Sequence, residues 1–316
     1  MSVERAVQHV TVDLDAGQRI DNFLLRELSG VPRSRVYRMV RKGEVRVNGR
    51  RIGPYYKLRA GDVVRVPPWH GAPQALAAQV PGWQLDRLEG AVLFEDDALM
   101  VVNKPAGLAV HGGSGIQLGL IEILRQQRPE LDRLALVHRL DRDTSGCLLL
   151  AKTRPALLAM HRAFREGQVR KTYDLLVHGG WPRRVRTVSL KLSRYVTASG
   201  ERRVRVDASG KASRTDFEIE RRSDRVSWLR AHPQTGRTHQ IRVHAQAEGH
   251  PLVGDEKYAS EAQLGQARAA ALNRLYLHAR VLTLPEAAGG HRFEVPAPDD
   301  FEVAWEKMRG ASGAPD

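Results

Sequence analysis

The sequence has little of what cross-links or anchors a protein. Its 316 residues include one cysteine, Cys147, which excludes a disulfide framework and a metal cluster held by cysteines alone. It lacks an uncharged apolar run of the roughly 18 residues that a membrane-spanning helix needs. The first residues alternate in polarity and include acids, unlike a signal or transit peptide. We therefore expect a protein of the reducing cytoplasm without a membrane partner.

Negative charge is also scarce. Against 50 Lys and Arg the chain has 36 Asp and Glu, a formal net charge of +14 with a pI near 10.4. Such an excess favours a polyanionic partner, above all a nucleic acid. The remaining composition, 42% hydrophobic and 27% charged, is that of a globular protein and excludes wholesale disorder. At 35.3 kDa the chain can bury one large core and still carry a small second domain.

The positive charge is concentrated near the N-terminus. Between residues 19 and 65, 13 Lys and Arg face 4 Asp and Glu, a net charge of +9. Apolar residues three and four apart from Ile20 to Leu28 predict a short amphipathic helix, and those from Val36 to Val40 predict another. Asn48-Gly49 predicts a tight hairpin after them. The second helix would turn five cations outward: Arg33, Arg35, Arg38, Arg41 and Lys42. Taken alone, this basic face has two interpretations: it binds RNA, or it is a solvated surface of a structural domain.

The basic region consists of short blocks in a characteristic order. They are Arg19-Ile20-Asp21, Ser34-Arg35, Arg41-Lys42-Gly43, Val47-Asn48-Gly49, and Leu58 followed by Gly61-Asp62. This order resembles the S4 RNA-binding domain. The resemblance implies contacts to RNA phosphates, which supply affinity and salt dependence with little choice of sequence.

Composition and pattern divide the chain into five parts. These are an N-terminal arm (1–16), an S4-like domain (17–66), a linker with four prolines and three glycines (67–90), a large domain (91–308) and a flexible tail (309–316). In the large domain many short strands alternate with a few helices. We therefore predict an α+β fold, in which a small N-terminal α/β domain precedes a large domain built on a mixed, mainly antiparallel sheet with flanking helices and loops.

A polar segment, Val137 to Gly146, leads directly into an apolar strand. Its residues are compatible with several kinds of site. Asp141 and Asp143 suit a Mg²⁺-dependent nuclease. Ser145 with His138 suits nucleophilic catalysis, although their spacing matches no recognisable arrangement. A single Asp held ionised by an arginine suits a nucleophile or base. A salt-bridged turn without function is a further interpretation.

Further blocks surround this segment in the large domain. They are Asn103-Lys104-Pro105 with Gly107, His138 to Gly146, Lys171 with Tyr173, Gly210-Lys211 with Ser213 and Thr215, Thr235 to His244, Gly249-His250-Pro251, Gly254-Asp255 and Leu277-His278-Ala279. Together they resemble the RluA family of pseudouridine synthases, over about residues 92 to 301 and in family order. Within that family the sequence is most similar to the subgroup that modifies uridines of 23S large-subunit ribosomal RNA.

The resemblance implies roles for individual residues. Asp141 would be the catalytic nucleophile or base, Arg242 would pair with it, and Tyr173 would stack on uracil and assist proton transfer. RNA contacts are implied for four residues: Arg139, Lys171, Arg237 and His239. Neither a metal nor another cofactor is implied.

The expected partner is 23S ribosomal RNA or its precursor particle, bound by a monomer. The alternative is a non-catalytic S4-type RNA-binding or ribosome assembly factor.

Overall fold

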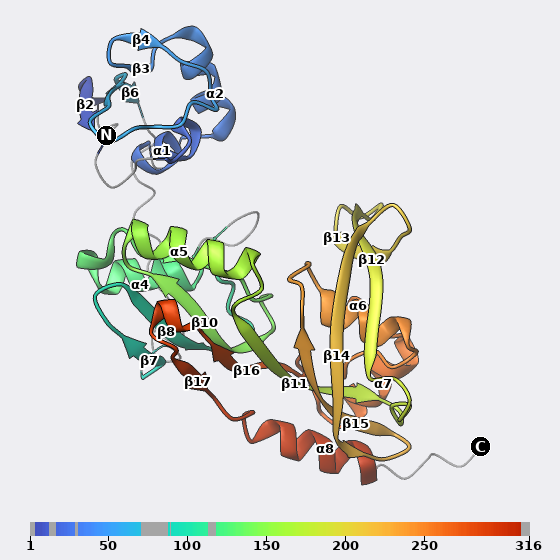
Figure 1. The fold of residues 1–316 in the computed structure, drawn as a ribbon. Coiled ribbons are helices and arrows are strands. Elements are labelled where there is room, and N and C mark those ends of the chain that lie inside the picture. Colours follow the sequence, from blue (N-terminus) through green and yellow to red (C-terminus); the bar gives the residue numbers. More distant parts are fainter. Residues whose placement is uncertain are drawn as a thin grey trace. The chain divides into compact units, whose positions relative to one another are not determined.

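The protein is represented by a computed structural model that describes residues 4–12, 17–28, 31–70, 88, 90–112 and 118–310 (Figure 1). The chain divides into two compact units, residues 1–81 and 82–316. Most of the expected linker, parts of the expected N-terminal arm and nearly all of the expected tail lie outside the described residues. Of the helices described, none combines the length and the apolarity required to cross a membrane.

The N-terminal unit packs two helices against a small antiparallel sheet. The helices are α1 (Ile20–Glu27) and α2 (Arg33–Lys42). The sheet has the order β2-β5-β3-β4, with bounds Gln8–Thr11 for β2, Arg46–Val47 for β3, Arg50–Arg51 for β4 and Val63–Val66 for β5. A separate antiparallel pair joins β1 (Glu4–Arg5) to β6 (Trp69–His70).

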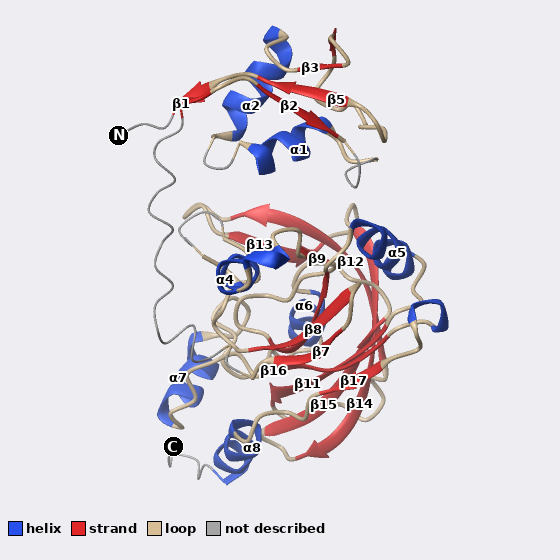
Figure 2. Ribbon diagram, turned by 90° about the vertical axis from the view of Figure 1, so that its left-hand side faces the viewer, coloured by secondary structure: helices blue, strands red, loops and turns tan. Residues whose placement is uncertain are grey.

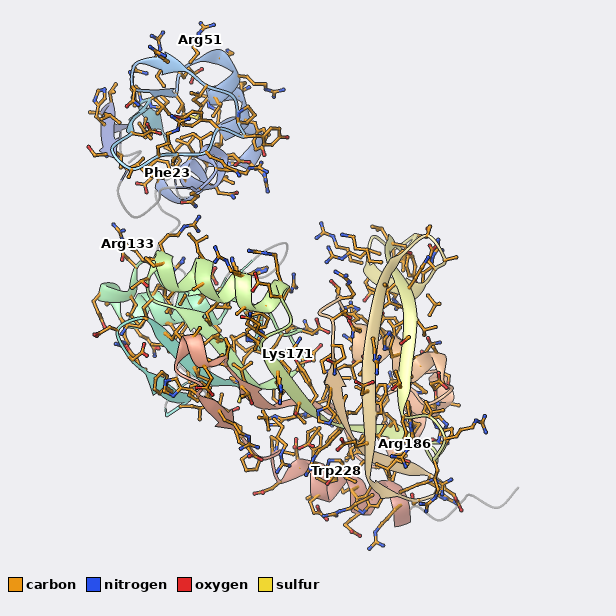
Figure 3. All side chains as sticks on the ribbon, in the orientation of Figure 1. Phe23, Arg51, Arg133, Lys171, Arg186 and Trp228 are labelled. Carbon is orange, nitrogen blue, oxygen red and sulfur yellow. The ribbon has the colours of Figure 1, made fainter. Side chains whose placement is uncertain are left out.

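The apolar stripes predicted from the sequence form the core of this unit. Ile20, Phe23 and Leu24 of α1 are completely buried, and they share one cluster with the apolar side of α2. Figure 3 shows Phe23 inside the unit and Arg51 pointing out of it. The five cations of α2 are exposed, as the helical pattern predicted.

The predicted hairpin joins β3 and β4 at Asn48-Gly49. Both residues have positive φ, 50° and 74°, the conformation that a two-residue turn of this handedness requires. This turn chemistry explains why the hairpin could be located from two letters of sequence.

The described strands of the C-terminal unit form one eleven-stranded sheet. Its main path is β13-β12-β14-β15-β11-β16-β10-β8-β7, with β17 beside β16 and β9 beside β10. Among the described pairs β10 and β16 run parallel and the others antiparallel, which confirms the expected mixed sheet. The bounds are β7 Val92–Glu95, β8 Leu99–Lys104, β9 Ala135–Leu136, β10 Ser145–Ala151, β11 Arg170–His178, β12 Thr187–Val196, β13 Arg202–Val206, β14 Lys211–Arg222, β15 Val226–Pro233, β16 Leu277–Thr283 and β17 Arg292–Glu294.

Helices cover both faces of this sheet (Figure 2). On β11, Leu175 packs in one cluster with Ile241, whereas its neighbour Leu176 packs in another with Phe301. Because successive side chains of a strand point to opposite faces, the helices that carry Ile241 and Phe301 lie on opposite sides. The helices are α4 (Leu120–Gln127), α5 (Arg154–Arg165), α6 (Gln240–Ala247), α7 (Glu261–Ala269) and α8 (Asp300–Gly310).

A glycine is required where β10 meets its parallel neighbour. Gly146 has φ +105°, and a Cβ atom there would overlap the carbonyl oxygen of Ala279 on β16. We predict that Gly146→Ala lowers the free energy of unfolding by about 2–4 kcal/mol, measured by urea denaturation.

Gly265 provides the control, because it lies inside α7 and has open space at its Cβ position. Gly265→Ala should stabilise the protein by up to about 1 kcal/mol through helix propensity. Equal stability of the two variants would contradict the close approach at Gly146.

Candidate active site

The loop that carries Asp141 links β9 to β10 and is held by a buried lysine. Lys104, the last residue of β8, is completely buried. Its ammonium group donates hydrogen bonds of 2.8 Å to the carbonyl oxygens of Pro105, Leu108 and Arg142. A buried ammonium requires such acceptors, and one of the three belongs to the loop itself. The backbone next to Asp141 is therefore tied to the end of a central strand.

The start of the loop is held by His138. Its Nε2 accepts a hydrogen bond of 3.0 Å from the backbone amide of Leu149 in β10. Burial lowers the pKa of His138 to about 3, so the ring is neutral and Nε2 can accept. The aromatic side chain of Phe164 stacks on it, with the ring centroids 5.0 Å apart.

Arg242 connects the loop to the other half of the sheet. From the first turn of α6, its Nη1 donates to Oδ2 of Asp141 at 3.1 Å. Its Nε and Nη2 donate to the two oxygens of Asp255 at 2.8 and 2.6 Å. Arg242 and Asp255 are buried, whereas the side chain of Asp141 keeps 20% of its surface exposed. The guanidinium of Arg242 thus joins two carboxylates, of which that of Asp141 faces solvent.

The charges around Arg242 reinforce one another. Burial by itself lowers the pKa of Arg242, but the hydrogen bond and charge of Asp255, together with Asp141, outweigh it and raise that pKa above its ordinary value. The guanidinium is a permanent cation, so Asp141 faces a fixed positive charge at a distance of 3.1 Å. Its planar fork fixes the direction from which Asp141 is approached.

His239 lies beside Asp141 at the start of α6. Its backbone is left-handed, with φ 51°, and its Nε2 lies 3.7 Å from Oδ2 of Asp141. Its Nδ1 lies 2.7 Å from the hydroxyl of Tyr258, which accepts a hydrogen bond from the backbone amide of Val204. The hydroxyl can therefore donate to Nδ1, which leaves the ring proton on Nε2, toward Asp141. Burial lowers the pKa of His239 to about 4, so the ring is neutral at neutral pH.

A cleft of about 310 Å³ opens above Asp141, Tyr173 and Arg242. This volume lies at the lower end of the range of about 300–1,000 Å³ that small-molecule sites occupy. Burial, followed by the negative charge of Asp141, raises the pKa of Tyr173 above its ordinary value, so the phenol keeps its proton. A second cavity of about 970 Å³ shares Arg139, Asp141, His239 and Arg242 with the cleft. Asp141 is thus open to space on two sides of its loop.

The structure brings together all the site residues that the sequence predicted for the large domain. Four residues expected to contact RNA also line the cleft: Arg139, Lys171, Arg237 and His239. Lys171, labelled in Figure 3, lies on β11 two residues before Tyr173, and burial lowers its pKa. The five cations of α2 belong to the N-terminal unit.

Sequence reasoning missed several residues of the site. It gives no role to Lys104, Asp255 or Tyr258, although Lys104 and Asp255 fall in blocks that carry the family resemblance. Arg194 of β12 lines the cleft and donates a hydrogen bond of 2.7 Å to the hydroxyl of Thr238. No motif surrounds Arg194 in the sequence. The strand pattern therefore marks it only as an exposed basic residue.

One of the interpretations left open by the sequence is contradicted by the structure. Ser145 is buried and lies 2.9 Å from Nδ1 of His278, whose Nε2 donates to the carbonyl of Val295 at 3.0 Å. The pairing of Ser145 with His138 is therefore wrong. Asp143 is ion-paired with Arg142 at 3.0 Å. Within the described residues no three His, Cys, Asp or Glu side chains are grouped closely enough to hold a metal ion.

Comparisons with known proteins agree with this geometry. Residues 98–247 match the family of RNA pseudouridylate synthases, and residues 18–64 match the S4 domain. The chain is 49% identical to the ribosomal large subunit pseudouridine synthase C of Escherichia coli O157:H7, over 96% of both chains. It is 50% identical to the protein of the same name from Yersinia pestis, over 94% of this chain and 93% of that one. The solved structure of human RNA pseudouridylate synthase domain containing 4 superimposes with a TM-score of 0.59 at 25% identity, covering 72% of this chain and 96% of that chain.

The buried fork of Arg242 generates a prediction about stability. Asp255→Ala removes the two shorter hydrogen bonds of Arg242. The buried guanidinium of Arg242 then keeps Asp141 as its carboxylate partner. We expect the free energy of unfolding to fall by about 3–5 kcal/mol, measured by urea denaturation. Asp143→Ala, which breaks a solvent-exposed pair, should cost less than about 1 kcal/mol. Similar small losses in both variants would show that Asp255 is not required to hold Arg242.

Buried histidines generate a prediction about pH. Burial lowers the pKa of five of them from 6.5, to about 3 for His138 and about 4 for His178, His239, His244 and His278. Below pH 6.5 the unfolded chain binds protons that the folded chain does not, so stability falls as the pH falls toward 4. The free energy of unfolding should be clearly lower at pH 5.5 than at pH 7.

Carboxyl groups with lowered pKa values do not account for a loss of stability between pH 7 and pH 5.5. The pKa values of Glu95, Glu201 and Asp207 are lowered to about 2, mainly by hydrogen bonds from Arg128, Lys257 and Ser209 respectively. Their contribution to stability is lost only below the pKa of the unfolded carboxyl groups, near 4. Equal stability at pH 7 and pH 5.5 would mean that these histidines are not buried in the neutral form.

Proposed function

The chain belongs to the family of RNA pseudouridylate synthases, and on this basis we propose that it isomerises uridines of large-subunit ribosomal RNA with Asp141 as the reacting carboxylate. The observation that carries the proposal is the position of Asp141: it is held by Arg242 at the floor of a cleft and remains partly open to solvent. The choice of RNA is supported by the names of the two bacterial relatives and by the S4 match.

The reaction places clear demands on the site. The N1–C1′ bond of uridine breaks, the uracil turns, and C5 bonds to C1′, while C5 loses a proton to water and N1 gains one. The oxidation state does not change, so the chemistry calls for no redox cofactor. Because the uridine is stacked in RNA, it must first be extruded into a pocket. The cleft above Asp141 is the pocket that we assign to it.

Asp141 acts on the sugar of the extruded nucleotide, by attack on C1′ or by removal of the proton on C2′. Both routes need an ionised carboxylate in a fixed orientation. Arg242 supplies the positive charge and the orientation, and Asp255 keeps Arg242 in place. His239 directs its Nε2 toward the same carboxylate oxygen.

Tyr173 and the surrounding cations handle the base and the phosphates. The ring of Tyr173 can stack on uracil, and its protonated hydroxyl can take part in the late proton transfer at C5. Arg139 is exposed and reaches both cavities, so its guanidinium can fill the space left by the extruded base. Lys171, Arg194 and Arg237 surround the cleft, where they can contact phosphates on either side of the uridine.

We further propose that the protein works as a monomer in the cytoplasm, on 23S ribosomal RNA or its precursor particle. In this scheme the basic face of α2 binds the RNA backbone, and the large domain performs the chemistry. A non-catalytic assembly factor would use the same basic face without needing Asp141 or Tyr173. The two functions differ in what loss of Asp141 does.

The test follows tritium at C5. Wild-type protein and Asp141→Ala are incubated with C5-tritiated 23S ribosomal RNA transcript in excess EDTA. Wild type should release tritium to water, and Asp141→Ala should release it at least about 1,000-fold more slowly, with RNA binding nearly unchanged.

Asp143→Ala is the matched control, because it removes a carboxylate from the same loop that is already paired with Arg142. It should retain most of the activity. Release by Asp141→Ala would overturn the assignment of that residue. Absence of release by wild type from large-subunit, small-subunit and transfer RNA transcripts would favour the assembly factor.

A further inference from the structure

An exposed tyrosine stands out on the N-terminal unit. Tyr55 has 65% of its surface exposed, the largest fraction among the exposed large hydrophobic side chains described. It follows the β3–β4 hairpin and precedes the strand β5. An aromatic ring left in water forgoes the free energy of burial. A ring in this position is available to a partner that stacks on it.

One side of this ring is already covered by Arg19. The centre of the Arg19 guanidinium lies 4.3 Å from the centroid of the Tyr55 ring. Two hydrogen bonds to Asp21 hold the guanidinium, from Nε to Oδ1 at 3.0 Å and from Nη2 to Oδ2 at 2.6 Å. Asp21 is completely buried. The guanidinium that covers the ring is therefore held in place by a bidentate ion pair and is not free to rotate.

Tyr37 ties this arrangement to the basic face of α2. The hydroxyl of Tyr37 donates to Oδ2 of Asp21 at 2.6 Å and accepts from Nη2 of Arg33 at 3.3 Å. Arg33 itself lies 3.8 Å from the same carboxylate oxygen, and its side chain is 64% exposed. The first cation of α2 thus lies against the group that fixes Arg19.

We propose that Tyr55, backed by Arg19, is a stacking platform for an unpaired base of the RNA, and that Arg33 binds a phosphate next to that base. A base has a π-face whatever its identity, so stacking adds affinity with little sequence preference. The platform is preorganised, because Asp21 holds Arg19 before RNA arrives, and this reduces the entropy lost on binding. The N-terminal unit then recognises single-stranded or looped RNA, beyond the phosphate contacts that any basic helix makes.

This inference rests on the proposed RNA substrate, and its test does not depend on turnover. Full-length wild type, Tyr55→Ala, Tyr55→Phe and Arg38→Ala are titrated with a short single-stranded RNA and with a duplex of the same length, at several salt concentrations. Tyr55→Ala should bind the single strand roughly tenfold more weakly, within the range measured for loss of one stacked base, and bind the duplex as wild type does. Tyr55→Phe should bind both as wild type does.

The salt dependence separates stacking from charge. Tyr55→Ala should leave the slope of log affinity against log salt unchanged, whereas Arg38→Ala should reduce it by roughly 0.7–0.9 for each phosphate that the arginine neutralises. Three results would overturn the proposal: wild-type binding of the single strand by Tyr55→Ala, an equal loss of affinity for the duplex, or a loss in Tyr55→Phe as large as in Tyr55→Ala. If wild type fails to isomerise uridine in ribosomal RNA, the proposed function fails while this binding comparison still decides the platform.

Discussion

The site depends on one arginine shared by two carboxylates. Arg242 makes its two shorter hydrogen bonds to Asp255, which is buried, and its longer one to Asp141, which is partly exposed. The buried pair has little freedom, because an unpaired charge in that position is strongly unfavourable. The strength of the Asp255 contact therefore sets the position of the guanidinium, and the guanidinium sets the position of Asp141. A carboxylate on a loop gains in this way the rigidity of a helix packed on a sheet.

The same contact explains why the fold needs so large a sheet. Asp141 and Arg242 are 101 residues apart in sequence, on a loop next to β10 and on α6 over β11, β14 and β15. The strand β16 lies between β10 and β11 and aligns the two halves. Its parallel pairing with β10 begins at Ser145, four residues after Asp141. A shift of register there would move the carboxylate away from its cation, which is why the crowded glycine beside it matters.

Local patterns in the sequence are sufficient to predict some of the elements. The buried stripe of α1 and the hairpin at Asn48-Gly49 follow from periodicity and turn chemistry. Asp141, Tyr173 and Arg242 are assigned by resemblance, and their roles stay proposals. The contacts of Lys104, Asp255 and Tyr258 depend on which distant segments meet. The spacing of a buried polar residue in the sequence does not say which partner it has. Ser145 is an example, because its hydroxyl pairs with His278 of β16 and not with a histidine of its own loop.

A division of labour between the two units follows from how binding relates to catalysis. Contacts that hold the substrate equally in the ground and transition states lower KM without raising kcat. The phosphate contacts that we propose for the exposed cations of α2 are of this kind. The cleft holds a single carboxylate among its described lining residues, with cations around it. In the proposed reaction the cleft can then be tuned to the transfer of negative charge from Asp141 to the departing uracil, because α2 contributes affinity for the rest of the RNA.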